Sequence, residues 1–141
     1  SELDPVKYLI PKGKKDHDLV QKTLVDSQEI ERLKLFMEEK KPYLDPDLSI
    51  HDLASGLNMQ TKELSVLINH TLNKHFFDFI NEYRINEAKK LLVDPTKEKY
   101  TVLEILYEVG FNSKSSFNTA FKKHSGLTPT EYRKKYSLRV A

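Results

Sequence analysis

The sequence carries one pattern of apolar and turn-forming residues twice, and this repeat restricts the possible folds more than any other feature. Residues 49–79 align with residues 101–132 when one extra residue is allowed in the second copy. Because apolar residues recur three and four positions apart in both copies, each copy is predicted to form amphipathic helices. The matching pairs are Ser49 and Thr101, Ile50 and Val102, Leu53 and Ile105, Leu57 and Val109, Met59 and Phe111, Leu64 and Phe117, Ile68 and Phe121, Asn73 and Gly126, and Phe79 and Tyr132.

A tight turn between two helices is predicted in each copy. Asn58 and Gly110 occupy the same place in the two copies, and these residue types adopt a positive φ more readily than others. Ala54 supplies a small residue where the helices of the first copy cross, and Leu106 is its counterpart in the second. Two helices that meet steeply across such a turn form a helix-turn-helix unit, whose second helix, the recognition helix, enters the major groove of DNA.

The other apolar stripes also have helical spacing, so the chain is predicted to be all-α. An early helix is expected to begin near Asp26, because Asp26 and Glu29 resemble a capping box. The first 27 residues contain two prolines, a glycine and mixed charges, which indicates an irregular segment with at most a short helix over residues 18–25. The expected division is a linker or fragment edge over 1–27, a first helix-turn-helix subdomain over 28–75, a linker helix over 76–93 and a second subdomain over 94–141.

Basic residues are concentrated at the C-terminal end of the 141-residue chain, although its net charge is only +2. From Lys114 to Ala141 there are seven Lys and Arg and one acid, whereas residues 1–113 carry sixteen bases and twenty acids. A basic end favours a polyanionic partner, and a solvated charged terminus is the alternative. The chain has no Cys, which excludes disulfides and thiolate chemistry. It also has no apolar run long enough to span a membrane, and no signal-peptide pattern opens it.

The outer faces of the two predicted recognition helices carry small polar and basic residues. Asn can bind adenine through two hydrogen bonds, Ser can donate or accept, and an outward Val suits the methyl group of thymine. Residues that bind backbone phosphates position a protein on DNA without reading its sequence. The candidate base-reading residues are Lys62, Ser65, Val66 and Asn69 in the first helix and Lys114, Ser115, Asn118 and Thr119 in the second. The candidate phosphate ligands are Ser113, at the amide-rich helix start, and Lys122, Lys123, Arg133 and Lys134.

Several stretches resemble the DNA-binding module of the AraC/XylS family of bacterial transcription regulators. The most specific match is "ILYEVGFNSKSSFNTAFKKHSGLTPTEYRKKY", with a glycine–aromatic turn, a serine, a Phe-x-x-x-Phe-Lys frame, Gly-x-x-Pro and Tyr-Arg. Two earlier stretches, "SIHDLASGLNMQTKELSVLIN" and "FFDFINEYRINEAKKLL", also match. The resemblance covers roughly residues 28–136.

The resemblance implies a seven-helix module of two helix-turn-helix subdomains that bind adjacent major grooves of double-stranded DNA. It places base reading on the outward residues named above, and it implies no cofactor. RNA polymerase and a sensor domain upstream in the full-length chain are further expected partners. The expected location is the cytoplasm, with membrane attachment through the sensor as an open alternative. The sequence departs from the family at Leu106, where Ala is usual, and in having few bases on the first recognition helix.

Two other classes of function were weighed against DNA binding. A protein-interaction module without DNA binding would use the apolar stripe of Ile30, Leu33, Phe36 and Met37 to dock a partner, although such a stripe more often belongs to a core. An enzyme is not expected, because the sequence has no phosphate-binding loop and no nucleophile elbow. No metal site is expected either, because the five His residues lack the spacing of a helical zinc pair.

Overall fold

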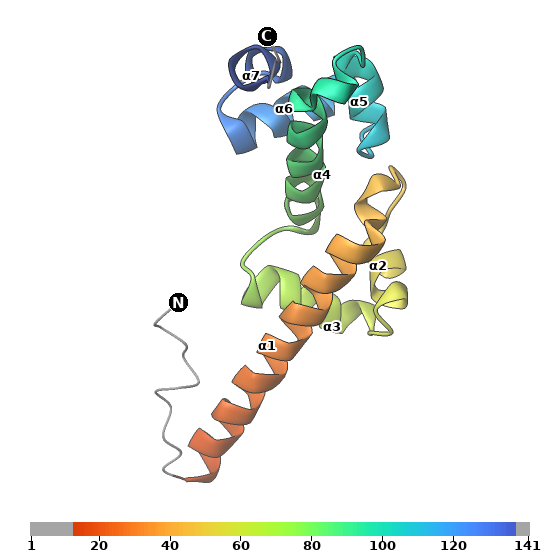
Figure 1. The fold of residues 1–141 in the computed structure, drawn as a ribbon. Coiled ribbons are helices and arrows are strands. Elements are labelled where there is room, and N and C mark those ends of the chain that lie inside the picture. Colours follow the sequence, from red (N-terminus) through yellow and green to blue (C-terminus); the bar gives the residue numbers. More distant parts are fainter. Residues whose placement is uncertain (1–12, 138–141) are drawn as a thin grey trace.

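Every regular element in residues 13–137, the part of the chain that the structure describes, is helical, as the sequence predicts. The computed structural model has seven α-helices in this range. Figure 1 shows α4 as a rod between a lower group formed by α1, α2 and α3 and an upper group formed by α5, α6 and α7. The elements are α1 (Lys14–Lys40), η2 (Pro42–Leu44), α2 (Ile50–Gly56), α3 (Thr61–Val66), η3 (Leu67–Thr71), α4 (Phe76–Val93), η4 (Pro95–Lys97), α5 (Val102–Glu108), α6 (Lys114–Ser125) and α7 (Pro129–Tyr136).

Helix α1 is much longer than predicted, and the expected irregular segment is wrong from residue 14 onward. The helix runs for 27 residues, and no Pro or Gly interrupts it, so nothing in the sequence ends it earlier. Asp26 therefore lies inside the helix, and the predicted capping box with Glu29 is not its start. The rest of the predicted linker, residues 1–12, lies outside the described residues. Although α1 is long, neither it nor any other described helix is apolar enough to cross a membrane.

Two hydrophobic cores lie along α4, one in each group of helices. Leu33 and Met37 of α1 are fully buried in the first core, so the stripe considered above for docking a partner packs inside the protein. The first core contains Leu33, Met37, Tyr43, Leu48, Leu53, Ala54, Leu57, Leu64, Leu67, Ile68, Phe79 and Ile80. The second contains Ile85, Ala88, Leu92, Ile105, Leu106, Val109, Phe111, Phe117, Ala120 and Phe121. Because α4 contributes to both cores, it connects the two groups through packed side chains.

The two predicted turns have the same backbone geometry. Asn58 and Gly110 both adopt positive φ, at 57° and 101°. In each turn the next amide returns to the first helix: Met59 N–H donates to the Ala54 carbonyl at 2.9 Å, and Phe111 N–H to the Leu106 carbonyl at 2.9 Å. We call residues 49–73 the first unit and residues 101–126 the second unit. Each is a helix-turn-helix, as the repeat predicts.

A buried arginine on α4 joins the first group of helices to the turn of the second unit. The side chain of Arg84 is only 6% exposed; its Nε donates to the Tyr43 carbonyl at 2.7 Å and its Nη2 to the Asp45 carbonyl at 2.9 Å. Its guanidinium also lies 5.7 Å from the ring centre of Phe111. Burial lowers the pKa of Arg84, and the two carbonyl acceptors offset part of the cost of burying its charge.

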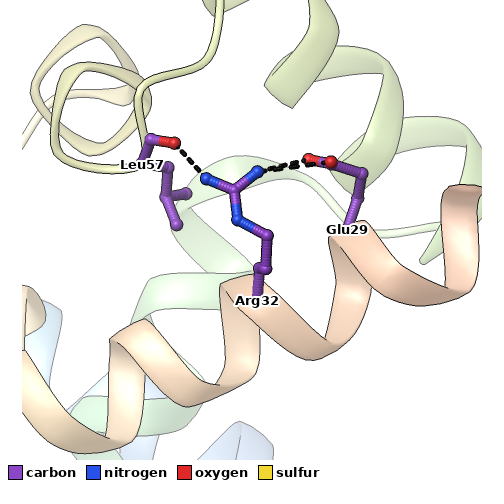
Figure 2. A network of polar contacts seen from close by, with 3 residues as sticks. All are labelled: Glu29, Arg32 and Leu57. Carbon is purple, nitrogen blue, oxygen red and sulfur yellow. Dashed lines mark hydrogen bonds and ion pairs between the residues drawn. The ribbon is translucent and has the colours of Figure 1, made fainter.

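A second arginine makes a related contact in the first unit, as Figure 2 shows. Arg32 of α1 donates to the carbonyl of Leu57, the residue before Asn58, and also pairs with Glu29 at 3.2 Å. The side chain of Arg32 remains 50% exposed. Each turn therefore lies beside an arginine from a flanking helix, but only the arginine beside the second turn is buried.

Candidate nucleic-acid interface

The recognition helix of the first unit is formed by α3 and its continuation η3. Leu64, Leu67 and Ile68 recur three and four positions apart and are buried in the first core, which fixes the inner face of the helix. From residue 67 the helix widens into a π-helical segment, with Leu72 N–H donating to the Leu67 carbonyl five residues earlier at 2.9 Å. The sequence predicted one continuous helix here and gave no signal for this change, although π-helical turns are frequent at functional sites.

The predicted base-reading residues of the first unit lie on the outer face of this helix. Lys62, Val66 and Asn69 are exposed, and Ser65 is half-buried. Asn69 Nδ2 donates to Ser65 Oγ at 3.1 Å, so the Asn69 amide is already oriented along the helix. Val66 is 47% exposed, which leaves its methyl groups available for an apolar contact.

Helix α6 is the recognition helix of the second unit, and aromatic side chains hold it in place. Phe117 and Phe121 are fully buried. Phe117 contacts Phe111 with ring centres 5.2 Å apart, and Phe121 contacts Tyr132 of α7 with ring centres 5.4 Å apart. These contacts fix the inner face of α6 against the turn and against α7. All four predicted base-reading residues of this unit, Lys114, Ser115, Asn118 and Thr119, are exposed.

Most of the predicted phosphate ligands lie at the surface of the second group of helices. Ser113 caps α6: its Oγ accepts from Ser116 N–H at 3.2 Å and donates to Ser116 Oγ at 3.0 Å. Lys122 and Lys134 are exposed. Lys123 is also exposed, but its Nζ lies 2.8 Å from Asp78 Oδ1 of α4, so binding a phosphate requires it to leave that carboxylate.

Arg133 has a structural role that conflicts with its predicted contact to phosphate. Its Nε donates to the Leu92 carbonyl at 3.1 Å and its Nη1 to the Tyr100 carbonyl at 2.6 Å. Its Nη2 is buried and has no hydrogen-bond partner among residues 13–137. The guanidinium thus ties α7 to the end of α4 and to the segment before α5, so a contact between Arg133 and phosphate would compete with these two hydrogen bonds.

A groove of about 610 Å³ beside α6 brings several candidate residues together. It is lined by Lys114, Asn118 and Lys122 of α6, together with Thr101 and Thr128 at the starts of α5 and α7. The two threonines were not among the residues predicted for this surface. Their hydroxyls cap α5 and α7 by accepting the amides of Glu104 and Glu131, each at 3.1 Å.

A second groove, of about 420 Å³, lies between α1 and the first recognition helix. Lys62 and Val66 face Lys22, Asp26 and Glu29 of α1 across it. The sequence did not place α1 beside the recognition helix, because residues 14–27 were expected to be irregular. Asp26 and Glu29 put negative charge next to Lys62, so this side of the first unit is less favourable for phosphate than the surface of α6.

No group of three His, Asp or Glu residues within residues 13–137 is arranged to hold a metal ion.

Comparison with known proteins identifies relatives of this arrangement. A family model described as a helix-turn-helix domain matches residues 53–135, more than half of the chain. An uncharacterised HTH-type transcriptional regulator in the cgkA 5′ region of Pseudoalteromonas carrageenovora is 34% identical over 91 residues, which are 64% of this chain and 52% of that protein. The melibiose operon regulatory protein of Escherichia coli K12 is 30% identical over 90 residues, 64% of this chain and 29% of that protein.

A solved structure shares the fold. A transcriptional regulator described as an AraC-type DNA-binding domain-containing protein from Chromobacterium violaceum aligns with a TM-score of 0.65 and 21% identity, over 81% of this chain and 99% of that chain. The chain thus spans almost the whole of that solved domain, but only about half or less of the curated relatives described above.

Proposed function

The chain belongs to the AraC-type family of helix-turn-helix transcription regulators, and from this premise we propose that α3 and α6 enter adjacent major grooves of one DNA duplex. The observation that carries the proposal is that both recognition helices expose their predicted reading residues, apart from the half-buried Ser65, while they lie near opposite ends of α4 (Figure 1). The mechanism is equilibrium binding, in which no covalent bond is made or broken.

The length of α4 supports simultaneous binding by both units. Its 18 residues span about 27 Å at 1.5 Å per residue, which is comparable to the roughly 34 Å of one DNA turn. Since both cores pack on α4, the units keep a fixed separation. Two rigidly spaced recognition helices fit successive major grooves on one side of the duplex.

The second unit is proposed to supply most of the contact with the phosphate backbone. Lys114 and Lys122 flank the groove beside α6, and Lys134 is exposed on the neighbouring α7. The start of α6 adds the amides next to Ser113, which favour anions. Binding through these groups releases counterions, so affinity falls steeply as salt concentration rises.

Base reading is proposed for the outer faces of both recognition helices. In the second unit Asn118, between Lys114 and Lys122 on the helix surface, presents an amide that matches the adenine edge. In the first unit Asn69 presents the same group, and Val66 offers an apolar contact to a thymine methyl group. Lys62, Ser65, Ser115 and Thr119 complete the proposed reading set.

Larger partners are proposed on the ground that the relatives are longer than this chain. The chain spans 52% of the Pseudoalteromonas regulator and 29% of the melibiose regulator, which leaves room for a sensor domain upstream in the full-length protein. RNA polymerase is proposed as a second partner, because regulation of transcription has to reach the polymerase. The proposed location of the module is the cytoplasm, where the sensor domain and RNA polymerase are accessible to it.

Selection from a random duplex library, followed by footprinting of the chain on the selected sequence, tests the proposal. Asn118→Ala and Asn69→Ala are each expected to weaken binding by about 10- to 100-fold, the equivalent of roughly 1–3 kcal/mol for a bidentate contact, and to relax preference at different bases. Asn86→Ala, an exposed asparagine of α4, is the matched control and should bind like the wild type. If both test variants keep wild-type affinity and protect the same bases, the groove assignments are wrong. No retained duplex at low salt would favour the protein-interaction alternative.

A further inference from the structure

A groove of about 550 Å³ lies between the two units, and most of its lining residues have no role in the proposal above. Its lining comes from the end of the first recognition helix, from the following loop and α4, and from the end of α6. We call it the histidine groove because three of the five histidines of the chain line it. The lining residues are Asn69 and His70 from η3, Asn73, Lys74 and His75 from the loop, Asp78 and Glu82 from α4, and Lys123 and His124 from α6.

The permanent charges in the histidine groove cancel in two ion pairs. Lys74 Nζ lies 2.6 Å from Glu82 Oε2, and Lys123 Nζ lies 2.8 Å from Asp78 Oδ1. The remaining lining residues are two asparagines, which are neutral, and three histidines. The net charge of the groove is therefore set by the histidines: it is near zero when they are neutral and reaches +3 when all are protonated.

The three histidines are accessible, and two of them lie near an acid of the groove. His70 and His75 are exposed, and His124 is half-buried. The hydrogen bond from Lys123 is the main cause that lowers the pKa of Asp78, and the charges of His75 and His124 act in the same direction. The two imidazoles thus lie close enough for their charge to reach the Asp78 carboxylate. Imidazole is the side chain that most readily gains or loses charge in the physiological pH range.

The histidine groove is continuous with the proposed DNA surface at both of its ends. Asn69 belongs to the reading set of the first unit and Lys123 to the phosphate set of the second, and both line the groove. Figure 1 shows the end of the first recognition helix and the end of α6 on the same side of α4. A duplex that receives both recognition helices has to cross the space between them, and the part of the duplex nearest to that space is its sugar–phosphate backbone.

We propose that the histidine groove is a third contact with DNA, which binds backbone phosphate between the two major grooves when its histidines are protonated. This inference rests on the proposed function of α3 and α6. Phosphate would draw Lys123 and Lys74 away from their carboxylates and would favour the charged form of His70, His75 and His124. Binding is then coupled to proton uptake, and affinity for DNA rises as pH falls.

The sign and size of this coupling follow from proton linkage. A histidine that gains a phosphate partner has a higher pKa in the complex than in the free protein, so the complex binds more protons between those two pKa values. If two or three histidines respond, affinity is expected to increase on the order of tenfold or more between pH 8 and pH 6. With neutral histidines the groove has no net charge and contributes little.

Fluorescence anisotropy with one selected duplex, at fixed ionic strength and at several pH values between 6 and 8, tests the inference. The variant His70→Asn/His75→Asn/His124→Asn removes the titrating groups and retains polar side chains. Wild-type affinity should rise on the order of tenfold toward pH 6, while the variant changes less than about twofold and matches the wild type near pH 8. His17→Asn on α1 is the control and should keep the wild-type pH dependence. Circular dichroism confirms that each protein is folded.

The outcomes separate this inference from the proposed function. If the wild type binds DNA equally well across the pH range, or if the triple variant keeps the full pH dependence, the third contact is overturned while binding by α3 and α6 stands. If the wild type binds no selected duplex at any pH, both proposals fail. Hydroxyl-radical footprinting at pH 6 gives an independent result: protection of the backbone between the two major grooves should be present for the wild type and lost for the triple variant.

Discussion

The two units have the same turn but different recognition helices. Residues 61–73 carry one Lys and one Glu, whereas residues 114–126 carry three Lys and no acid. At equivalent places the first unit has Asn69 where the second has Lys122. The two helix-turn-helix units therefore present different surfaces, one nearly neutral and one basic. In the proposed complex the second unit anchors the protein on the backbone, and the first adds discrimination at little electrostatic cost.

The two recognition helices also differ in how firmly they are held. Helix α6 begins with a Ser113 cap and continues as regular α-helix to Gly126, with buried Phe117 and Phe121 beneath it. Helix α3 begins at Gln60, which makes no side-chain cap bond, and then widens into the π-helical η3. Fewer local interactions specify the first recognition helix, so it depends more on packing against α1 and α4.

The largest loss of unfolding free energy is expected when Gly110 of the second turn is replaced by alanine. In Gly110→Ala the new Cβ would lie 2.3 Å from the Tyr43 carbonyl oxygen and 2.8 Å from Arg84 Nε, at a φ of 101°. Strain and clash together should cost about 4 kcal/mol of unfolding free energy in urea denaturation. Gly126→Ala has a positive φ of 77° but meets nothing within 4 Å, and should cost only about 1 kcal/mol. Equal losses for the two variants would show that the approach to Arg84 is unimportant.

The flanking arginines should give the next largest contrast. Arg84→Met leaves the carbonyls of Tyr43 and Asp45 without their buried donor, and should cost about 3 kcal/mol. Arg32→Met removes a half-exposed side chain that has one backbone acceptor, and should cost about 1 kcal/mol or less. Urea denaturation of both variants measures the two losses. An Arg32 variant as destabilised as the Arg84 variant would contradict the asymmetry of the two turns.

Substitutions at the two N-caps should make the two recognition helices more similar in stability. Ser113→Ala removes the hydroxyl that accepts from Ser116 N–H and should cost about 1 kcal/mol. Gln60→Ala should be close to neutral, because Gln60 makes no cap bond. Gln60→Ser introduces a capping hydroxyl and should raise stability by about 0.5–1 kcal/mol. Thermal and urea unfolding detect these changes, and a neutral Ser113→Ala variant would show that the cap is unimportant.

The ion pair between α4 and α6 should have the smallest effect. The hydrogen bond from Lys123 is the main cause that lowers the pKa of Asp78, so its carboxylate stabilises the folded state above its unfolded pKa. That stability is lost as pH falls through the lower folded pKa. Because both side chains are largely exposed, Asp78→Asn should cost about 0.5 kcal/mol or less at pH 7 and nothing near pH 2. A loss that persists at pH 2 would exclude this ionic origin.

Local signals in the sequence predicted the features that depend on neighbouring residues. The positive φ at Asn58 and Gly110 follows from residue type, and the long helix over residues 76–93 agrees with Phe76–Val93 in the structure. The predicted start of α1 was wrong. Asp26 and Glu29 have the composition of a capping box, but such a pair also occurs inside helices. The absence of any Pro or Gly between residues 14 and 41 was the stronger signal.

Features that depend on distant residues were not predictable in the same way. Arg133 lies in a basic stretch, but the carbonyls that bind it belong to Leu92 and Tyr100, more than thirty positions earlier. Arg84 had a weak signal, because it falls four residues after Ile80 and four before Ala88 on the buried side of α4. A charged residue in that register indicates a buried hydrogen-bonded role. The base-reading assignments are still predictions.

The contacts of Arg84 have a consequence for the spacing of the target sites on DNA. Since Arg84 of α4 is bonded to the carbonyls of Tyr43 and Asp45 and lies beside Phe111 in the second turn, we expect neither unit to rotate freely about α4 to follow a displaced target. Inserting one base pair between the two target sites shifts them by about 3.4 Å and rotates them by about 34° around the duplex axis. The protein would then require a fixed spacing between its two target sites. On a DNA site with an inserted base pair, only one of the two recognition helices would keep its contact.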